Sequence, residues 1–153
     1  MSKTVGKPGD KAYPKALNTI GDYLKSKRLD LGLEGIEVAN LLKVHPQTIT
    51  NWELNHSQPS IEHLPRIIDF IGYDPFEIQG DSIQALILNY QRRVGVGLPT
   101  LARRIGIDPG TLIRVSKGEQ QPFKKTEQKI RAYISEGTYP SFNKLLTPNI
   151  PTI

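Results

Sequence analysis

The chain has 153 residues, of which 37% are hydrophobic and 23% charged, values typical of a globular protein with one ordinary domain or two very small ones. No apolar run approaches the roughly 18–20 residues that cross a bilayer, and the basic N-terminus lacks the apolar core of a secretory signal. The absence of cysteine excludes disulfides, thiolate catalysis and the common structural zinc sites, and it favours a cytoplasmic location.

The net charge of +5 is unevenly distributed along the chain. Residues 1–18 carry four Lys and one Asp, whereas residues 19–80 carry five basic and nine acidic side chains. Residues 81–137 carry ten basic and five acidic side chains. A positive chain favours anionic partners, and here the second half provides most of the attraction.

A basic arm over residues 1–18 precedes the first stretch with helical periodicity, and we expect this arm to be flexible. Thr19 and Asp22 have the spacing of a capping box, which predicts that a helix starts there. Pro46 suits the first turn of a later helix, where its missing N–H costs nothing. Caps and periodicity together predict a first unit over 19–72, with helices between Thr19 and Gly32, over 35–42, over 46–55 and between Ser60 and Gly72.

Residues 73–81, YDPFEIQGD, are expected to form a linker, and beyond them the chain repeats itself at an offset of 63 residues. The repeat predicts a second, divergent unit over 82–137, with helices near 82–93, 98–105, 109–117 and 123–135. Residues 138–153 lack periodicity and are expected to form a flexible tail. The identical residues are Ile20, Gly32, Ala39, Pro46, Thr48, Gln58 and Pro59, which recur as Ile83, Gly95, Ala102, Pro109, Thr111, Gln121 and Pro122.

The second and third predicted helices of each copy have the spacing of two steeply crossing helices joined by a three-residue turn. Such a pair needs a small residue at its closest approach, and Ala39 and Ala102 occupy that place. The turn favours a positive φ, which Gly106 adopts without steric cost, whereas Lys43 holds the matching place in the first copy. The expected core residues are Val38, Leu42, Val44, Ile49 and Trp52 in the first copy, and Leu101, Ile105, Ile107, Leu112 and Val115 in the second.

Residues 20–59, above all VHPQTITNWE and the later Pro59, resemble a helix-turn-helix domain of the Xre/Cro (lambda-repressor-like) family. Residues 83–122 resemble the same family more distantly, and the whole is similar to two-copy bacterial regulators of this type. The resemblance implies an all-α protein made of two tandem lambda-repressor-like helix-turn-helix bundles. It also implies that the third helix lies in the DNA major groove, with its N-terminal half against base edges.

In the first copy, the resemblance directs Gln47, Thr50 and Asn51 toward DNA bases. An amide side chain donates and accepts at once, as the N6/N7 edge of adenine requires. The family usually has Gln where this chain has Gly35, and a Ser or Thr cap where it has His45. Phosphate contacts are expected from Lys25, Lys27, Arg28, Lys43 and the N-terminal lysines. The candidate DNA-binding residues of this copy are Lys43, His45, Pro46, Gln47, Thr48, Thr50 and Asn51.

The third helix of the second copy exposes Gly110, Ile113 and Arg114, of which only Arg114 could read a base, typically guanine. The surrounding basic side chains suit phosphates or an acidic protein partner. The candidate DNA-binding residues of this copy are Arg103, Arg104, Thr111, Arg114 and Lys117.

The patterns and the resemblance together imply a sequence-specific double-stranded DNA-binding transcriptional regulator, expected to act as a repressor by inserting helix 46–55 into the major groove. No enzyme activity, cofactor or metal is expected, since His45, His56 and His63 lack ligand spacing. One alternative is a protein-interaction module, antitoxin-like or an adaptor, which Gly35, His45 and the acidic first half favour. Another is an accessory DNA binder of a mobile element. A homodimer, or a protein partner of the second unit, stays open, and the expected location is the cytoplasm, at the nucleoid when DNA is bound.

Overall fold

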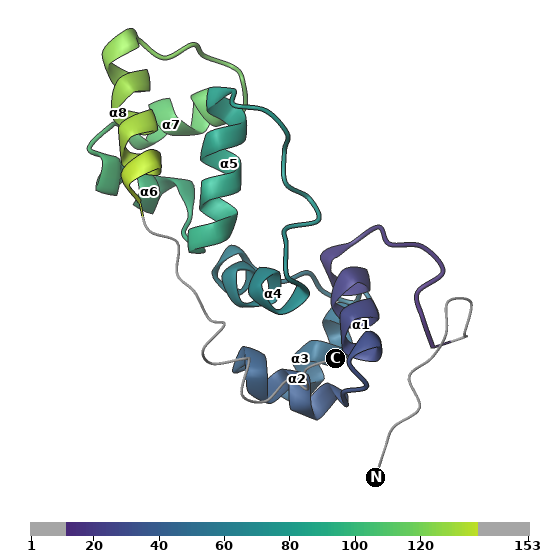
Figure 1. Ribbon diagram of the computed structural model, residues 1–153. Helices are drawn as coiled ribbons and strands as arrows, with labels where there is room; N and C mark the ends of the chain where they lie inside the picture. The colour runs from purple at the N-terminus through teal and green to yellow at the C-terminus, as the bar shows by residue number, and fades with distance from the viewer. Residues whose placement is uncertain (1–11, 138–153) are drawn as a thin grey trace. The chain divides into compact units, whose positions relative to one another are not determined.

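A computed structural model describes residues 12–137, and within that range all regular structure is helical (Figure 1). The described chain forms two compact units, and the boundary between them along the sequence lies between Pro75 and Phe76. The first contains α1 (Ile20–Asp30), α2 (Gly35–Leu42), α3 (Pro46–Glu53) and α4 (Leu64–Ile71). The second contains α5 (Ile83–Val94), α6 (Leu98–Ile105), α7 (Pro109–Ser116) and α8 (Lys124–Glu136). The prediction of an all-α fold is confirmed.

The predicted capping box starts α1. The Thr19 hydroxyl accepts a hydrogen bond from the Asp22 backbone N–H at 3.1 Å, and Asp22 Oδ2 accepts from the Thr19 N–H at 3.1 Å. Two of the free N–H groups at a helix start are thereby satisfied. The helix ends at Asp30, and the positive φ of Gly32 then turns the chain toward α2.

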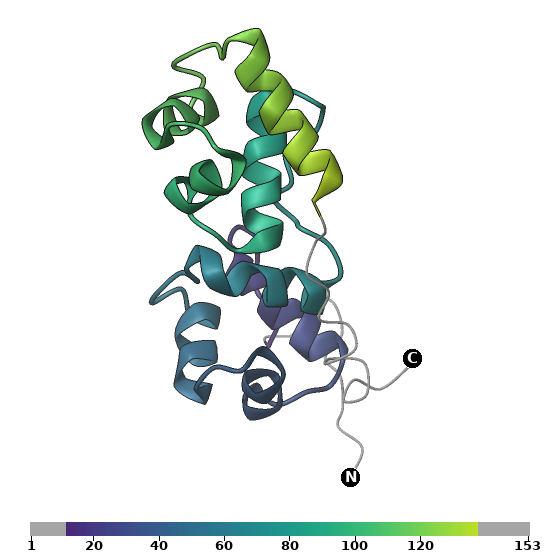
Figure 2. The ribbon, with the colours of Figure 1, turned by 90° about the vertical axis from the view of Figure 1, so that its left-hand side faces the viewer.

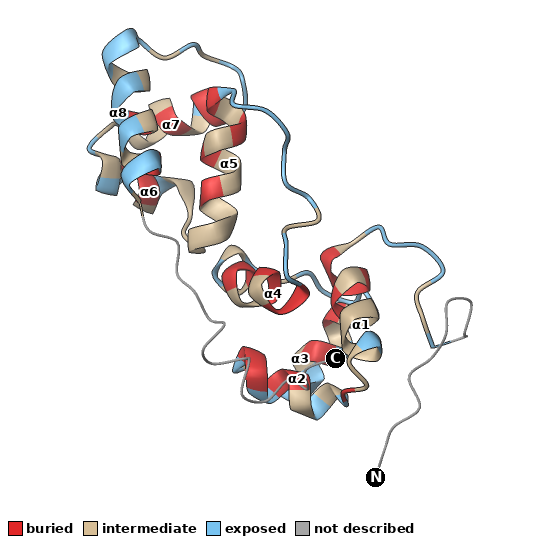
Figure 3. Cartoon of the chain, viewed as in Figure 1, coloured by how far each residue is buried: buried red, intermediate tan, exposed pale blue. Residues whose placement is uncertain are grey.

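The core of the first unit lies where α2 and α3 cross, with α1 packed on α3 and α4 packed on α1. Ala39 is fully buried at the crossing, flanked by the buried side chains of Val38, Leu42, Ile49 and Trp52. In Figure 3, buried stretches of α2 and α3 are coloured red. The predicted core of this unit is confirmed, with Val44 partly buried at its edge.

Two helix boundaries differ from the prediction. The third helix ends at Glu53 instead of Asn55, because Asn55 adopts a left-handed conformation with φ 61°. The fourth begins with a 3-10 turn over Ile61–His63, and α4 starts only at Leu64. Pro65 has no N–H to donate to the Ile61 carbonyl, so an α-helical bond cannot form there, and Leu64 makes the shorter bond instead.

The second unit has its own core around α5, which α7 and α8 contact, while α6 packs on α7 (Figure 2). Helices α6 and α7 have the same lengths as α2 and α3 and start 63 residues later, at the predicted repeat. The predicted core residues Leu101, Leu112 and Val115 are fully buried, and Ile105 and Ile107 pack against them.

Part of the expected linker is bound to α5. The Asn89 side chain accepts from the Ile78 backbone N–H at 2.9 Å and donates to the Ile78 carbonyl at 2.8 Å. Arg92 also lies over the Phe76 ring, 5.8 Å from its centre. The predictions of a flexible arm and a flexible tail fall outside the described residues, except over residues 12–18, where the Tyr13 hydroxyl donates to Asp30.

Candidate nucleic-acid interface

The turn between α2 and α3 sets the direction of α3. Lys43 adopts a left-handed conformation, φ 57° and ψ 47°, at the position that Gly106 occupies in the second unit. A side chain at such a position carries about 1–2 kcal/mol of strain, which the buried helix crossing must offset. The Lys43 side chain itself is exposed beside the start of α3.

The outward face of α3 is polar and uncharged. His45, Pro46, Gln47 and Thr50 are exposed, while Asn51 is partly buried. Gln47 Nε2 donates to Asn51 Oδ1 at 3.2 Å, so the two amides form a pair one helical turn apart. The pair still has donors and acceptors that this bond does not use. These groups can form hydrogen bonds with the donors and acceptors on base edges.

His45 caps the N-terminus of α3. Its Nδ1 accepts a hydrogen bond from the Gln47 backbone N–H at 3.1 Å, and Pro46 occupies the first helical position. Because Nδ1 is an acceptor here, a neutral ring carries its proton on Nε2 and can donate it outward. His45 therefore replaces the expected Ser or Thr as a working cap and keeps a donor at the exposed end of α3. Thr48 is partly buried on the same turn.

The C-terminal end of α3 is fastened to the start of α1 by three side chains. Asn55 Nδ2 donates to Asp22 Oδ1 at 3.1 Å, and the Thr19 hydroxyl donates to Asn55 Oδ1 at 2.7 Å. Burial raises the pKa of Asp22, but hydrogen bonds from Asn18, Asn55 and Thr19 outweigh it, and the net pKa lies below the usual value. The carboxylate thus stays charged in a nearly buried position, 8% exposed.

Gly21 permits this close approach between α1 and α3. A Cβ atom at Gly21 would overlap the backbone carbonyl oxygen of Trp52. Sequence reasoning identified neither Gly21 nor Asn55. The only signal for Asn55 was that Asn tolerates a left-handed conformation after a helix.

A second link joins α1 to the last turn of α3. Arg28 donates to both carboxylate oxygens of Glu53, at 2.7 and 2.8 Å, and to the Leu33 carbonyl at 3.0 Å. The bond to Glu53 raises the pKa of Arg28 above its already high usual value. Both side chains are largely buried. These bonds argue against the expected phosphate contact of Arg28, because its guanidinium already links α1 to α3.

The matching face of α7 is occupied by contacts within the second unit. Asp108 caps the helix through Oδ2, which accepts from the Thr111 N–H at 2.8 Å and from its hydroxyl at 3.1 Å. Arg114 Nε donates to Gln120 at 2.7 Å, and its guanidinium lies over Gly110, where a Cβ atom would be 3.1 Å from Nη1. The bonds from Thr111, with Arg114 nearby, lower the pKa of Asp108 below its usual value. The candidate reader Arg114 thus lies beside a carboxylate.

Three further basic candidates lie at the ends of α6 and α7. The side chains of Arg103, Arg104 and Lys117 are exposed, and Arg103 donates to the Thr100 hydroxyl at 3.3 Å. Within residues 12–137, His, Asp and Glu side chains nowhere gather in a group of three that could hold a metal ion. None of the helices in that range has the length and apolar character of a membrane span.

A family model described as helix-turn-helix matches residues 24–78, which include α2, the turn and α3. The match ends before α5, so it does not extend over the helices of the second unit. No curated protein and no solved structure matches the chain.

Proposed function

Because residues 24–78 form a helix-turn-helix domain of the Xre/lambda-repressor-like kind, a DNA-binding fold, we propose that this chain reads a specific duplex sequence by placing α3 in the major groove. The single observation that carries the proposal is the amide pair of the exposed Gln47 and the partly buried Asn51. An amide side chain suits adenine, to which it can donate and accept in one plane.

The support around α3 favours reading over an incidental polar surface. The helix has eight residues, too few to be stable alone in water. It is fixed at its start by the His45 cap, and at its end by the Asn55 contacts and the Arg28–Glu53 ion pair. Rigid positioning of a short polar helix is what recognition of base edges demands.

The second unit contributes to binding in a different way. Its α7 carries Asp108 where α3 carries His45, and Gly110 and Arg114 where α3 carries the amide pair. A carboxylate at that end repels phosphate, and the contacts of Arg114 must break before it reads a base. We therefore assign phosphate contacts to Arg103, Arg104 and Lys117, which add affinity without sequence preference.

As a regulator, the chain acts by occupying a promoter, which is repression by exclusion of the polymerase. This mode needs no chemical step and no cofactor, only high occupancy of a site that overlaps the promoter. It operates at the nucleoid in the cytoplasm, with the chain alone or paired on a two-fold site.

Selection of binding sites from a random duplex library tests the proposal. The full chain is expected to enrich one short consensus, and Gln47→Ala is expected to lose preference at one or two of its positions. Enrichment of no consensus, together with binding that depends on salt alone, would contradict sequence reading. That result would favour the protein-interaction alternative.

A further inference from the structure

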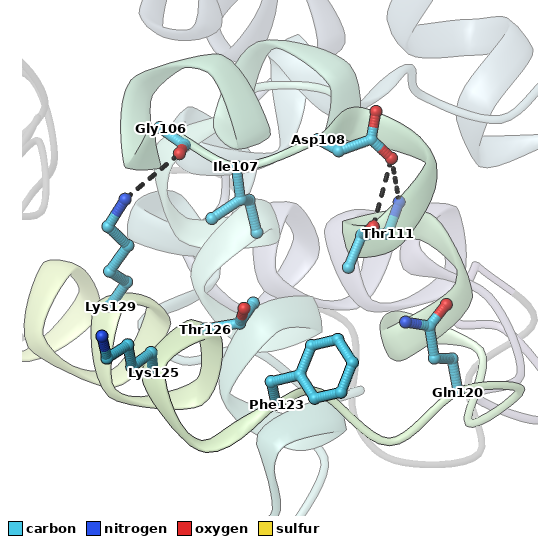
Figure 4. Close-up of a pocket in the computed structure, with 9 residues that line it drawn as sticks. All are labelled: Gly106, Ile107, Asp108, Thr111, Gln120, Phe123, Lys125, Thr126 and Lys129. Carbon is cyan, nitrogen blue, oxygen red and sulfur yellow. Dashed lines mark hydrogen bonds between the residues drawn. The ribbon is translucent and has the colours of Figure 1, made fainter.

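A pocket of about 390 Å³ lies in the second unit, between the turn that joins α6 to α7 and the first turns of α8 (Figure 4). Its size falls in the range of about 300–1,000 Å³ that small-molecule sites occupy. The lining residues are grouped by chemical type, as Figure 4 shows. Two lysines lie on one side, Asp108 and Gln120 lie on the other, and an apolar strip lies between them.

The apolar strip is built around an aromatic ring. Phe123 is 82% exposed, more than any other large hydrophobic side chain in the described residues. Ile107 and Thr126 line the pocket beside it. Because the ring is exposed to solvent, its flat face is accessible to a planar group that can stack on it.

The lysine side can hold an anion. Lys125 and Lys129 stand four residues apart on α8, hence on the same face of the helix. Both are exposed, and Lys129 Nζ makes a long bond of 3.4 Å to the Gly106 carbonyl. Two ammonium groups in this position favour a phosphate.

The opposite side combines an acceptor with a donor. Bonds from Thr111 to Asp108 Oδ2 keep that carboxylate charged, so a second anion is disfavoured there and an amino group is favoured. Gln120 uses its oxygen to accept from Arg114, and Figure 4 shows its amide nitrogen directed toward the pocket, where it can donate. An amino group beside a ring nitrogen offers the complementary pattern.

We propose that this pocket binds a nucleotide whose base carries an exocyclic amine, such as adenine or cytosine. The base stacks on Phe123, its amino edge contacts Asp108 and Gln120, and its phosphate contacts Lys125 and Lys129. The site belongs to the second unit and involves no residue of α3, so it stands or falls separately from duplex reading.

Titration of the isotope-labelled full chain, followed by amide NMR shifts, tests the site. Adenosine monophosphate is expected to shift the amide signals of Gly106, Thr111 and Thr126 until they saturate. Its dissociation constant is expected to be about tenfold lower than that of adenosine or of inorganic phosphate alone. Absence of a saturable shift, or equal binding of phosphate and nucleotide, would overturn the proposal. A short single-stranded oligoadenylate forms the second arm. Tighter binding of the oligomer at the same amides identifies a base of a single strand as the occupant, and tighter binding of the monophosphate identifies a free nucleotide.

Variants show whether the named side chains form the site. We expect binding of adenosine monophosphate to weaken about tenfold in Phe123→Ala, and also in the double variant Lys125→Gln with Lys129→Gln. Lys124→Gln is the matched control, since Lys124 is exposed beside Lys125 but does not line the pocket. Equal losses in the control and the pocket variants would assign the shifts to a general basic surface and contradict the proposal. The amide spectrum of each variant without ligand verifies that the second unit is folded.

Discussion

At the residue scale, His45 joins stability to binding. Its Nδ1 caps α3, and its exposed ring lies at the N-terminal end of α3, which we propose faces DNA. Asp108 caps α7 at the equivalent position of the second unit. The chain therefore contains its own comparison between an imidazole cap and a carboxylate cap.

Replacing His45 separates the two roles. His45→Ala should lower the free energy of unfolding of the first unit by about 0.5–2 kcal/mol, because the Gln47 N–H loses its acceptor. His45→Asp should preserve that stability yet weaken duplex binding, since a carboxylate meets the phosphates. Chemical denaturation and gel-shift titration measure the two effects. Unchanged duplex affinity in His45→Asp would place this end of α3 away from DNA.

Asp22 makes the first unit sensitive to acid. Its pKa is lower in the folded chain than in the unfolded one, so its contribution is complete above about pH 4 and is lost as the pH falls through the folded value. Asp22→Asn should therefore flatten the decline of unfolding free energy as the pH falls below about 4. Asp30→Asn, an exposed carboxylate on the same helix, is the control. Equal acid sensitivity of the Asp22 variant and the native chain would contradict the assignment.

At the element scale, the spacing between α1 and α3 depends on one missing side chain. Gly21→Ala should destabilise the first unit by about 1–3 kcal/mol or more, because its Cβ meets the Trp52 backbone, which cannot move aside as a side chain could. Gly35→Ala is the matched control, since a Cβ there meets nothing within 4 Å. The control should be neutral or stabilising by up to about 1 kcal/mol. Thermal unfolding followed by circular dichroism measures both, and a loss in the control alone would contradict this account of the packing.

The helices themselves were predictable because their signals are local. The Thr19 capping box and Pro46 at a first turn each specify structure within a few residues, and the 63-residue repeat shows the same local signals a second time. The contacts that fasten α3 were not, because Asn55 and Thr19 are 36 residues apart and Arg28 and Glu53 are 25 apart. No sequence period records which distant polar side chains meet, and so Arg28 was assigned to phosphate.

At the scale of the whole molecule, the described chain has two four-helix units with different surfaces. The first has an uncharged amide face on a negatively charged unit, and the second has basic side chains around a helix whose reader is already engaged. Sequence preference is then expected from the first unit, and much of the salt-dependent affinity from the second.

Arginine replacements in the second unit test this division. Arg103→Ala with Arg104→Ala should weaken all duplexes alike and reduce the slope of log affinity against log salt by roughly 0.9 for each lost contact. Gel-shift titrations on selected and random duplexes, at several salt concentrations, provide the measurement. A loss confined to the selected duplex would instead make these residues readers of sequence.

Contact between the amide face of α3 and base edges is best tested by a residue-by-base cycle. Gln47→Ala and Asn51→Ala are each measured on the selected duplex and on duplexes in which one A·T pair is replaced. If Gln47 and Asn51 contact bases, each variant loses about 1–3 kcal/mol of binding free energy on the selected duplex, and this loss nearly disappears when the contacted pair is replaced. The same loss on every duplex, or none on any, would contradict it.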